Sequence, residues 1–211
     1  MDIVAFDFDG TLSDSEMTVL LGEQYGVADQ MADITERAMK DEIDYATSLR
    51  ERAALLEDLP DARAQAAFEQ VYLRQGAAAV IERLNDAGVF TAVLTGGFHR
   101  GVEAALAREN VSVDTVIANS LPVEDDHLTG EVEGPLIEGT KDEALETLAM
   151  DEGVGLDATV AVGDGANDLP MLKVAGLSVG FEPKPAVRPH CDVVVATMDR
   201  LARVFEERGV L

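Results

Sequence analysis

MDIVAFDFDGTLSDSE (residues 1–16) opens the chain with a short apolar run that ends in closely spaced acidic residues. The run predicts a short buried strand, because it is almost continuously apolar and stops sharply. Asp7, Asp9 and Asp14 then follow within one short stretch. Carboxylates at this spacing repel one another. We therefore expect the rest of the chain to bring a cation or a proton to them.

Similar apolar runs recur along the chain and predict further strands. They are VFTAVLT (89–95), TVIA (115–118), TVAVGD (159–164), LSVGF (177–181) and DVVVA (192–196). Helical patterns lie between several of them, at residues 78–88, 98–110, 140–153 and 168–176. This alternation predicts an α/β fold with a doubly wound, mostly parallel, Rossmann-like sheet, in which the carboxyl ends of the strands share one edge. A hairpin is also predicted at HLTGEVEG (127–134), with Thr129 and Gly130 in its turn.

Residues 15–75 interrupt this alternation, because the segment contains no strand pattern and is almost entirely helical in character. Its helical stretches are EMTVLLGEQYG (16–26), DQMADITERAMK (29–40), DYATSLRERAALLEDL (44–59) and DARAQAAFEQVYLR (61–74). We therefore predict two domains. Residues 1–14 and 76–211 form an α/β core, and residues 15–75 form a small helical cap inserted after the first strand.

The composition narrows the class of protein. With 211 residues, 47% of them hydrophobic, the chain can bury a core. Asp and Glu total 41 against 16 Lys and Arg, a net charge of −25 that disfavours a nucleic-acid partner. No run approaches the ~20 apolar residues that cross a bilayer. The N-terminus lacks a signal-sequence pattern, so we expect a cytoplasmic protein without a membrane partner, as a monomer or homodimer.

Two further features of the composition are informative. Lysine is scarce, at four residues, and an acidic excess with little lysine resembles proteins of salt-loving organisms. Cys191 is the only cysteine, which excludes an intrachain disulfide and a cysteine zinc cluster. The remaining clues to function are therefore polar residues at strand ends.

Four polar groups fall at the ends of predicted strands or at the start of a helix. They are residues 7–11, residues 95–97, Lys141 and residues 164–168. Carboxylates from two strand ends, Asp7 and Asp164, together with a backbone carbonyl suit Mg²⁺. Residues 95–97 are expected to lead into a helix, where a threonine hydroxyl and free backbone N–H groups form a phosphate site. Lys141 adds a point charge for phosphoryl oxygens.

These residue types are suited to phosphoryl transfer. Mg²⁺ and Lys141 would keep Asp7 ionised, so that Asp7 can attack phosphorus and form an aspartyl-phosphate. Asp9 would protonate the leaving oxygen and then deprotonate the water that cleaves the intermediate. Each motif is weak alone, and the prediction depends on their joint occurrence in this order.

DFDGTL (7–12), LTGG (94–97), Lys141 and GDGANDLPML (163–172) resemble the four motifs of the haloacid dehalogenase superfamily of phosphatases. The resemblance covers the whole chain and implies that superfamily's fold, with the cap after the first strand. It implies that Asp7 is the nucleophile and a Mg²⁺ ligand, and that Asp9 is the acid/base and gives its backbone carbonyl to the metal. By the same resemblance the phosphate is bound by Thr95, Gly96, Lys141 and Asn167. Asp164 ligates the metal, and Asp168 orients its waters or Lys141.

Within this superfamily the chain is most similar to the phosphoserine phosphatases. Glu16 lies nine residues after Asp7, where those enzymes place a cap glutamate. SLRERAALLEDLP (48–60) resembles their SLRxRxxLLxxLP segment, with Arg50 as the substrate arginine and Arg52 as its closest competitor. Glu16 can pair with the ammonium of phosphoserine, and an arginine can hold its carboxylate with two hydrogen bonds.

The predicted activity is therefore Mg²⁺-dependent hydrolysis of O-phospho-L-serine, the last step of serine biosynthesis. Gly10 and Thr95 stand where those phosphatases usually have serine. This leaves open phosphohomoserine, phosphothreonine or another small phosphate as substrate, and also phosphotransfer to another alcohol. A phosphate-binding or metal-binding protein without turnover is a third possibility. The presence of Asp9 argues against a protein that only binds, because binding without turnover does not require the Asp9 side chain.

Overall fold

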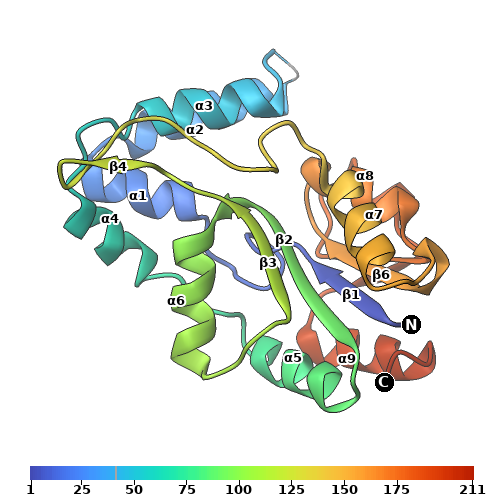
Figure 1. Cartoon of the computed structure of the whole chain (residues 1–211). Coiled ribbons are helices and arrows are strands. Elements are labelled where there is room, and N and C mark those ends of the chain that lie inside the picture. Colours follow the sequence, from blue (N-terminus) through green and yellow to red (C-terminus); the bar gives the residue numbers. More distant parts are fainter. Residues whose placement is uncertain (41) are drawn as a thin grey trace.

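The computed structural model describes residues 1–40 and 42–211, and its centre is a six-stranded parallel sheet (Figure 1). The strand order is β3-β2-β1-β6-β7-β8. The bounds are β1 (Ile3–Phe6), β2 (Phe90–Phe98), β3 (Thr115–Asn119), β6 (Thr159–Gly163), β7 (Leu177–Phe181) and β8 (Val193–Val195). The chain adds strands on one side of β1 and then on the other, so the order reverses beside β1. In sheets of this kind, ligands bind at the carboxyl edge next to that reversal. The predicted doubly wound sheet is confirmed.

Helices cover both faces of the sheet. One face carries α5 (Ala77–Asp86), α6 (His99–Glu109) and α9 (Met198–Glu207), and the other carries α7 (Lys141–Asp151) and α8 (Leu169–Val174). Short 3₁₀ turns occur at Leu156–Ala158, Ala166–Asp168 and Arg188–His190. Alternate residues of β1 belong to the two apolar clusters, because side chains alternate across a strand. A strand buried on both faces needs apolar residues throughout, as β1 has.

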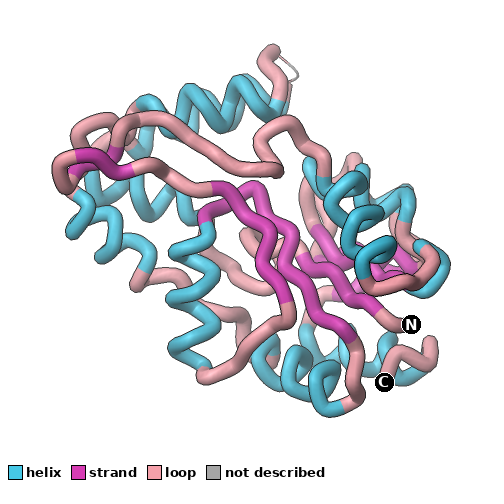
Figure 2. Tube along the Cα trace, in the orientation of Figure 1, coloured by secondary structure: helices cyan, strands magenta, loops and turns pink. Residues whose placement is uncertain are grey.

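Four helices lie between β1 and β2 in the sequence. They are α1 (Met17–Tyr25), α2 (Ala28–Met39), α3 (Tyr45–Ala54) and α4 (Asp61–Phe68). Figure 2 shows them gathered beyond one end of the sheet strands. Their positions match the four predicted helical stretches. Whether residues 15–75 form a domain of their own stays a prediction. None of the helices in the described ranges is long and apolar enough to cross a membrane.

A small hairpin is formed by β4 (Val123–Glu124) and β5 (His127–Leu128). The prediction that placed the hairpin at residues 127–134 was wrong. Its turn is made by Asp125 and Asp126, with φ of 47° and 62°. Aspartate tolerates this left-handed conformation, which tight hairpin turns require.

The hairpin packs against the segment between α3 and α4. The N–H of Leu128 donates to the carbonyl of Leu59 at 2.9 Å, and the N–H of Asp61 donates to the carbonyl of Asp126 at 2.8 Å. These backbone bonds tie the hairpin after β3 to the helices after β1. They also fix its register, because a one-residue shift would break both.

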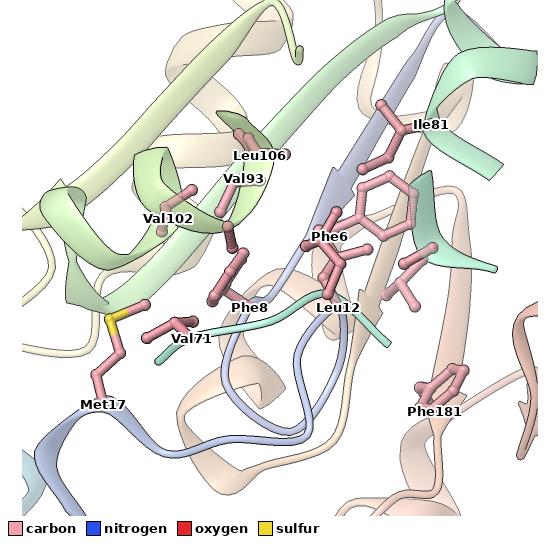
Figure 3. Packing of buried hydrophobic residues seen from close by; sticks show 14 of the residues in the cluster. Phe6, Phe8, Leu12, Met17, Val71, Ile81, Val93, Val102, Leu106 and Phe181 are labelled. Atoms are coloured by element: carbon pink, nitrogen blue, oxygen red, sulfur yellow. The ribbon is translucent and has the colours of Figure 1, made fainter. Parts of the chain in front are cut away.

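The loop after β1 is held by apolar side chains on both sides of its acidic residues. Phe6, Phe8 and Met17 are fully buried. Figure 3 shows Phe8, Met17 and Val71 packed close together beside the helix of Val102. The alternation continues past the end of β1, so that Phe8 enters the core while Asp7 and Asp9 face the carboxyl edge.

Candidate active site

A cavity of about 440 Å³ opens at the carboxyl ends of β1, β2 and β6, a size suited to a small ligand. The sheet side supplies Asp7, Asp9, Thr95, Gly96, Asp164 and Asn167. The helical segment after β1 supplies Glu16, Tyr45 and Arg52. The predicted strand-end groups therefore meet around one cavity.

Lys141, the first residue of α7, lies beneath this cavity with only 1% of its side chain exposed. Its Nζ donates to Asp7 Oδ1 at 2.5 Å and to Asp168 Oδ1 at 2.6 Å. The other oxygen of Asp168 accepts from the N–H groups of Asp164 (2.9 Å) and Gly165 (2.8 Å). Asp168 thus fixes both the lysine and the turn after β6. Charge-assisted bonds of this kind are short and directional.

Burial and crowding shift the ionisation of these groups. Burial, with Asp168 adding to it and Lys141 opposing it, raises the pKa of Asp7 to about 8. Burial, followed by the charges of Glu16 and Asp7, raises the pKa of Asp9 well above its usual value. Burial would lower the pKa of Lys141, but Asp168 and Asp7 outweigh it and raise that pKa. Lys141 is therefore charged, and it does not balance the buried carboxyl groups by itself.

The carboxylates also fit a divalent cation. Asp7, Asp164 and Asp168 each offer an oxygen, and these oxygens lie within 4.8 Å of one another. Because Asp168 already accepts from Lys141 and two backbone N–H groups, Asp7 and Asp164 are the freer ligands. Hard oxygen donors in this number suit Mg²⁺, which completes its shell with water and substrate. The cluster is thus compatible with the predicted metal.

Residues 95–97 lead into α6, which begins at His99, one residue after the predicted start of the helix. The strand before it is longer than predicted, because β2 runs to Phe98 instead of ending at Thr95. The pairing of β2 with β3 shifts register between Leu94 and Phe98. This irregularity resembles a bulge, which turns backbone groups out of the ladder. Within it, the N–H of Gly97 donates to Thr95 Oγ1 at 2.9 Å.

Asn119, at the end of β3, supports this segment and was not predicted. Its Nδ2 donates to the carbonyl of Gly96 at 3.0 Å, and its Oδ1 accepts from the N–H of Leu136 at 3.0 Å. Lys184 is a second unpredicted residue, with its Nζ 3.3 Å from Asp164 Oδ2 at the cavity wall. Sequence position gives little signal for either, since Asn119 ends β3 and Lys184 follows β7 without a recognisable motif.

The prediction that Arg50 faces the substrate is not supported by the geometry. Arg50 is 53% exposed and pairs with Glu138 outside the cavity. Arg52 lines the cavity instead, and its Nη1 donates to Thr18 Oγ1 at 3.1 Å. The physical reason is the helical turn, because residues two apart on an α-helix point ~200° from each other.

Comparisons with known proteins agree with this geometry. The model of the haloacid dehalogenase-like hydrolase family matches residues 4–173. A phosphoserine phosphatase of Halobacterium salinarum is 51% identical over 210 residues, covering 100% of both chains. One of Methanocaldococcus jannaschii is 38% identical over 198 residues, covering 93% of both. A solved structure of a phospho-aspartyl intermediate analogue of phosphoserine phosphatase matches with a TM-score of 0.88 at 36% identity, covering 98% of both. A substrate-bound phosphoserine phosphatase complex also matches with a TM-score of 0.88, at 36% identity over 98% of this chain and 97% of that one.

Proposed function

The chain belongs to the haloacid dehalogenase-like hydrolase family, and from this premise we propose that it hydrolyses O-phospho-L-serine to L-serine and phosphate with Mg²⁺. The observation that carries the chemistry is the buried contact of Lys141 with both Asp7 and Asp168 at the base of the cavity. The named activity of relatives that match along the full chain supports the substrate.

Asp7 is the nucleophile in this function. Its carboxylate attacks phosphorus, the bond from phosphorus to the serine oxygen breaks, and an aspartyl-phosphate forms. Lys141 holds Asp7 in place and offers positive charge to the phosphoryl oxygens. Mg²⁺ held by Asp7, Asp164 and the backbone carbonyl of Asp9 would keep the nucleophile ionised and neutralise phosphoryl charge. Asp168 orients Lys141 by accepting a hydrogen bond from its Nζ.

Asp9 is the acid and base. Its raised pKa lets it hold a proton for the leaving serine oxygen, and the resulting carboxylate then takes a proton from the attacking water. Its Oδ1 is buried without a hydrogen-bond partner among the residues that the structure describes. A β-carbon at Gly97 would lie 2.9 Å from Asp9 Oδ2, which is too close. Glycine at position 97 therefore leaves space for the Asp9 carboxyl group.

The remaining cavity residues divide between the two ends of the substrate. Thr95, Gly96 and Asn167, with Lys141, bind the phosphoryl group. Glu16 binds the ammonium group, and Arg52 takes the carboxylate in place of Arg50. The helical segment 15–75 acts as a cap that determines specificity over the core of residues 1–14 and 76–211. A cytoplasmic location, a monomeric or homodimeric state, and serine biosynthesis as the pathway stay predictions.

Phosphate release in molar KCl with Mg²⁺ tests this function. We would compare phospho-L-serine, phospho-L-threonine, phosphohomoserine, a sugar phosphate and an aryl phosphate. We expect phospho-L-serine to be strongly preferred. Equal turnover of all five would leave a phosphatase but contradict the amino-acid substrate. No release from a folded protein would favour a phosphotransferase or a protein that only binds.

Three variants assign the roles. Asp9→Asn should lower kcat by ~10²–10⁴-fold while Mg²⁺ binding survives. Arg52→Ala should raise KM for phospho-L-serine by ~10–100-fold, the effect of losing a charge-assisted pair. Arg50→Ala is the matched control on the same helix and should leave KM unchanged. An effect of Arg50→Ala equal to that of Arg52→Ala would contradict the assignment.

A further inference from the structure

Tyr45, the first residue of α3, reaches from the helical segment to the end of β2. A β-carbon at Gly96 would lie 1.7 Å from the Tyr45 hydroxyl oxygen and 2.9 Å from Cζ. The hydroxyl therefore lies directly against the backbone of Gly96, in space that any side chain at position 96 would occupy. The position of Tyr45 is set locally, because Asp44 caps the helix by accepting from the N–H of Thr47 at 2.6 Å.

None of the hydrogen bonds within residues 1–40 and 42–211 involves the Tyr45 hydroxyl, and the Tyr45 side chain lines the cavity. A phenol that borders a cavity can donate its O–H to a ligand bound there. Burial raises the pKa of Tyr45 to about 12, with the charges of Lys141 and Arg52 opposing the rise. The hydroxyl therefore keeps its proton at neutral pH and can act as a donor.

Tyr72 shows the contrast with an ordinary surface tyrosine. Its side chain is half exposed, and the guanidinium of Arg108 lies over its ring at 4.4 Å. It has no contact with the cavity. The placement of the Tyr45 hydroxyl beside Gly96 is thus a property of its position and not of the residue type.

We propose that Tyr45 donates a hydrogen bond from α3 to the phosphoryl group bound at Gly96, so that phosphate occupancy fastens the helical segment onto the sheet edge. This inference rests on the proposed function for the identity of the bound anion. The ligand class is a phosphate monoester or inorganic phosphate. The hydroxyl lies at the phosphoryl end of the cavity because Gly96 belongs to the predicted phosphate site and because Lys141 and Asp7 are close enough to affect its ionisation.

Binding of inorganic phosphate and of L-serine to the Mg²⁺-loaded protein, each measured by titration calorimetry, separates the two ends of the cavity. Tyr45→Phe keeps the ring and removes the hydroxyl. It should weaken phosphate binding by about 10-fold or more, the usual effect of losing a hydrogen bond to a charged group. L-serine binding should stay unchanged. Tyr72→Phe is the control and should match the wild type with both ligands.

Two results would overturn the inference. Unchanged phosphate binding by Tyr45→Phe would make the residue structural, and weakened L-serine binding with normal phosphate binding would move the contact to the amino-acid end. Phosphate binding does not require turnover, so the two proposals fail separately. A wild-type protein that binds phosphate but releases none from phospho-L-serine would refute the hydrolysis alone. A wild-type protein that binds no phosphate but releases it from phospho-L-serine would overturn the Tyr45 contact alone.

Discussion

Replacing Lys141 with methionine should destabilise the metal-free protein strongly at neutral pH. Methionine keeps the length and the apolar stem of the side chain, so packing changes little. The change removes the ammonium that bridges Asp7 and Asp168 at 2.5 and 2.6 Å. Removing one partner of a buried ion pair is costly because the carboxylates remain without compensation.

The magnitude follows from the burial of the three charged groups. The side chains of Lys141, Asp7 and Asp168 are 1%, 4% and 0% exposed. Breaking an ion pair this deeply buried, by removing one of its partners, costs about 3–5 kcal/mol. We therefore expect Lys141→Met to lower the free energy of unfolding by about this amount at pH 7.

Urea unfolding with a chelator, at constant molar KCl, measures the difference directly. Lys173→Met is the matched control, since Lys173 is an exposed lysine on α8 and should change stability by less than ~0.5 kcal/mol. A loss below ~1 kcal/mol for Lys141→Met at pH 7 would refute the reasoning. That result would mean that the two carboxyl groups do not depend on the ammonium for their balance.

Three further predictions concern the same charges and the loop that holds them. Because the folded-state pKa of Asp7 is raised to about 8, its contribution to stability is complete below the unfolded value of ~3.9 and is lost as pH rises toward 8. Urea unfolding of the metal-free protein should therefore show stability falling over that range, and Mg²⁺ should flatten the slope; a metal-free stability that rises with pH would contradict this. A net charge of −25 predicts a higher melting temperature in molar KCl than at low salt, and an unchanged melting curve would oppose it. Arg74 donates to the carbonyl of Gly10 at 3.1 Å and pairs with Glu182 at 3.2 Å. Arg74→Met should thus cost about 2 kcal/mol in urea unfolding and lower turnover, whereas Arg83→Met, at an exposed ion pair, should do neither.

The convergence of the strand-end residues could be predicted because it depends on two regular features. A continuously apolar strand is buried on both faces, and parallel strands place their carboxyl ends at one edge. Lys141 and Asp7 are therefore in contact although 134 positions separate them in the chain. No knowledge of side-chain packing was needed for this step, since strand order and direction were sufficient.

The rotation of a helix about its axis was the first feature that the prediction missed. Leu49 and Ala53 are buried and mark the inner face of α3. Arg52 lies three residues after Leu49 and so shares that face, whereas Arg50 lies only one residue after it. Tyr45, four residues before Leu49, shares the face as well. The signal was thus present in the spacing of the apolar residues, and similarity to a motif concealed it.

The position of the hairpin was the second feature that the prediction missed, because the local sequence was misleading. Glycine adopts a positive φ more easily than aspartate, so Thr129-Gly130 gave the stronger turn signal. Asp125 and Asp126 form the turn because Leu128 must bond to the backbone at Leu59. That contact joins distant parts of the chain, and no local pattern reveals it.

A highly acidic protein should repel an anionic substrate. At the site, this repulsion is offset by lysine side chains in direct contact with the carboxylates. Of the four lysines, Lys141 contacts Asp7 and Asp168, and Lys184 contacts Asp164. Half of a scarce residue type is thus placed where buried or half-buried carboxylates need a point charge. At molar salt the Debye length is ~3 Å, so repulsion between the surface and a phosphate ester is screened. The 2.5 Å contact beneath the cavity is shorter than that length and shielded from solvent. A highly acidic surface and a phosphate site are therefore compatible in one chain, because salt screens the surface charges and the buried lysine keeps its effect.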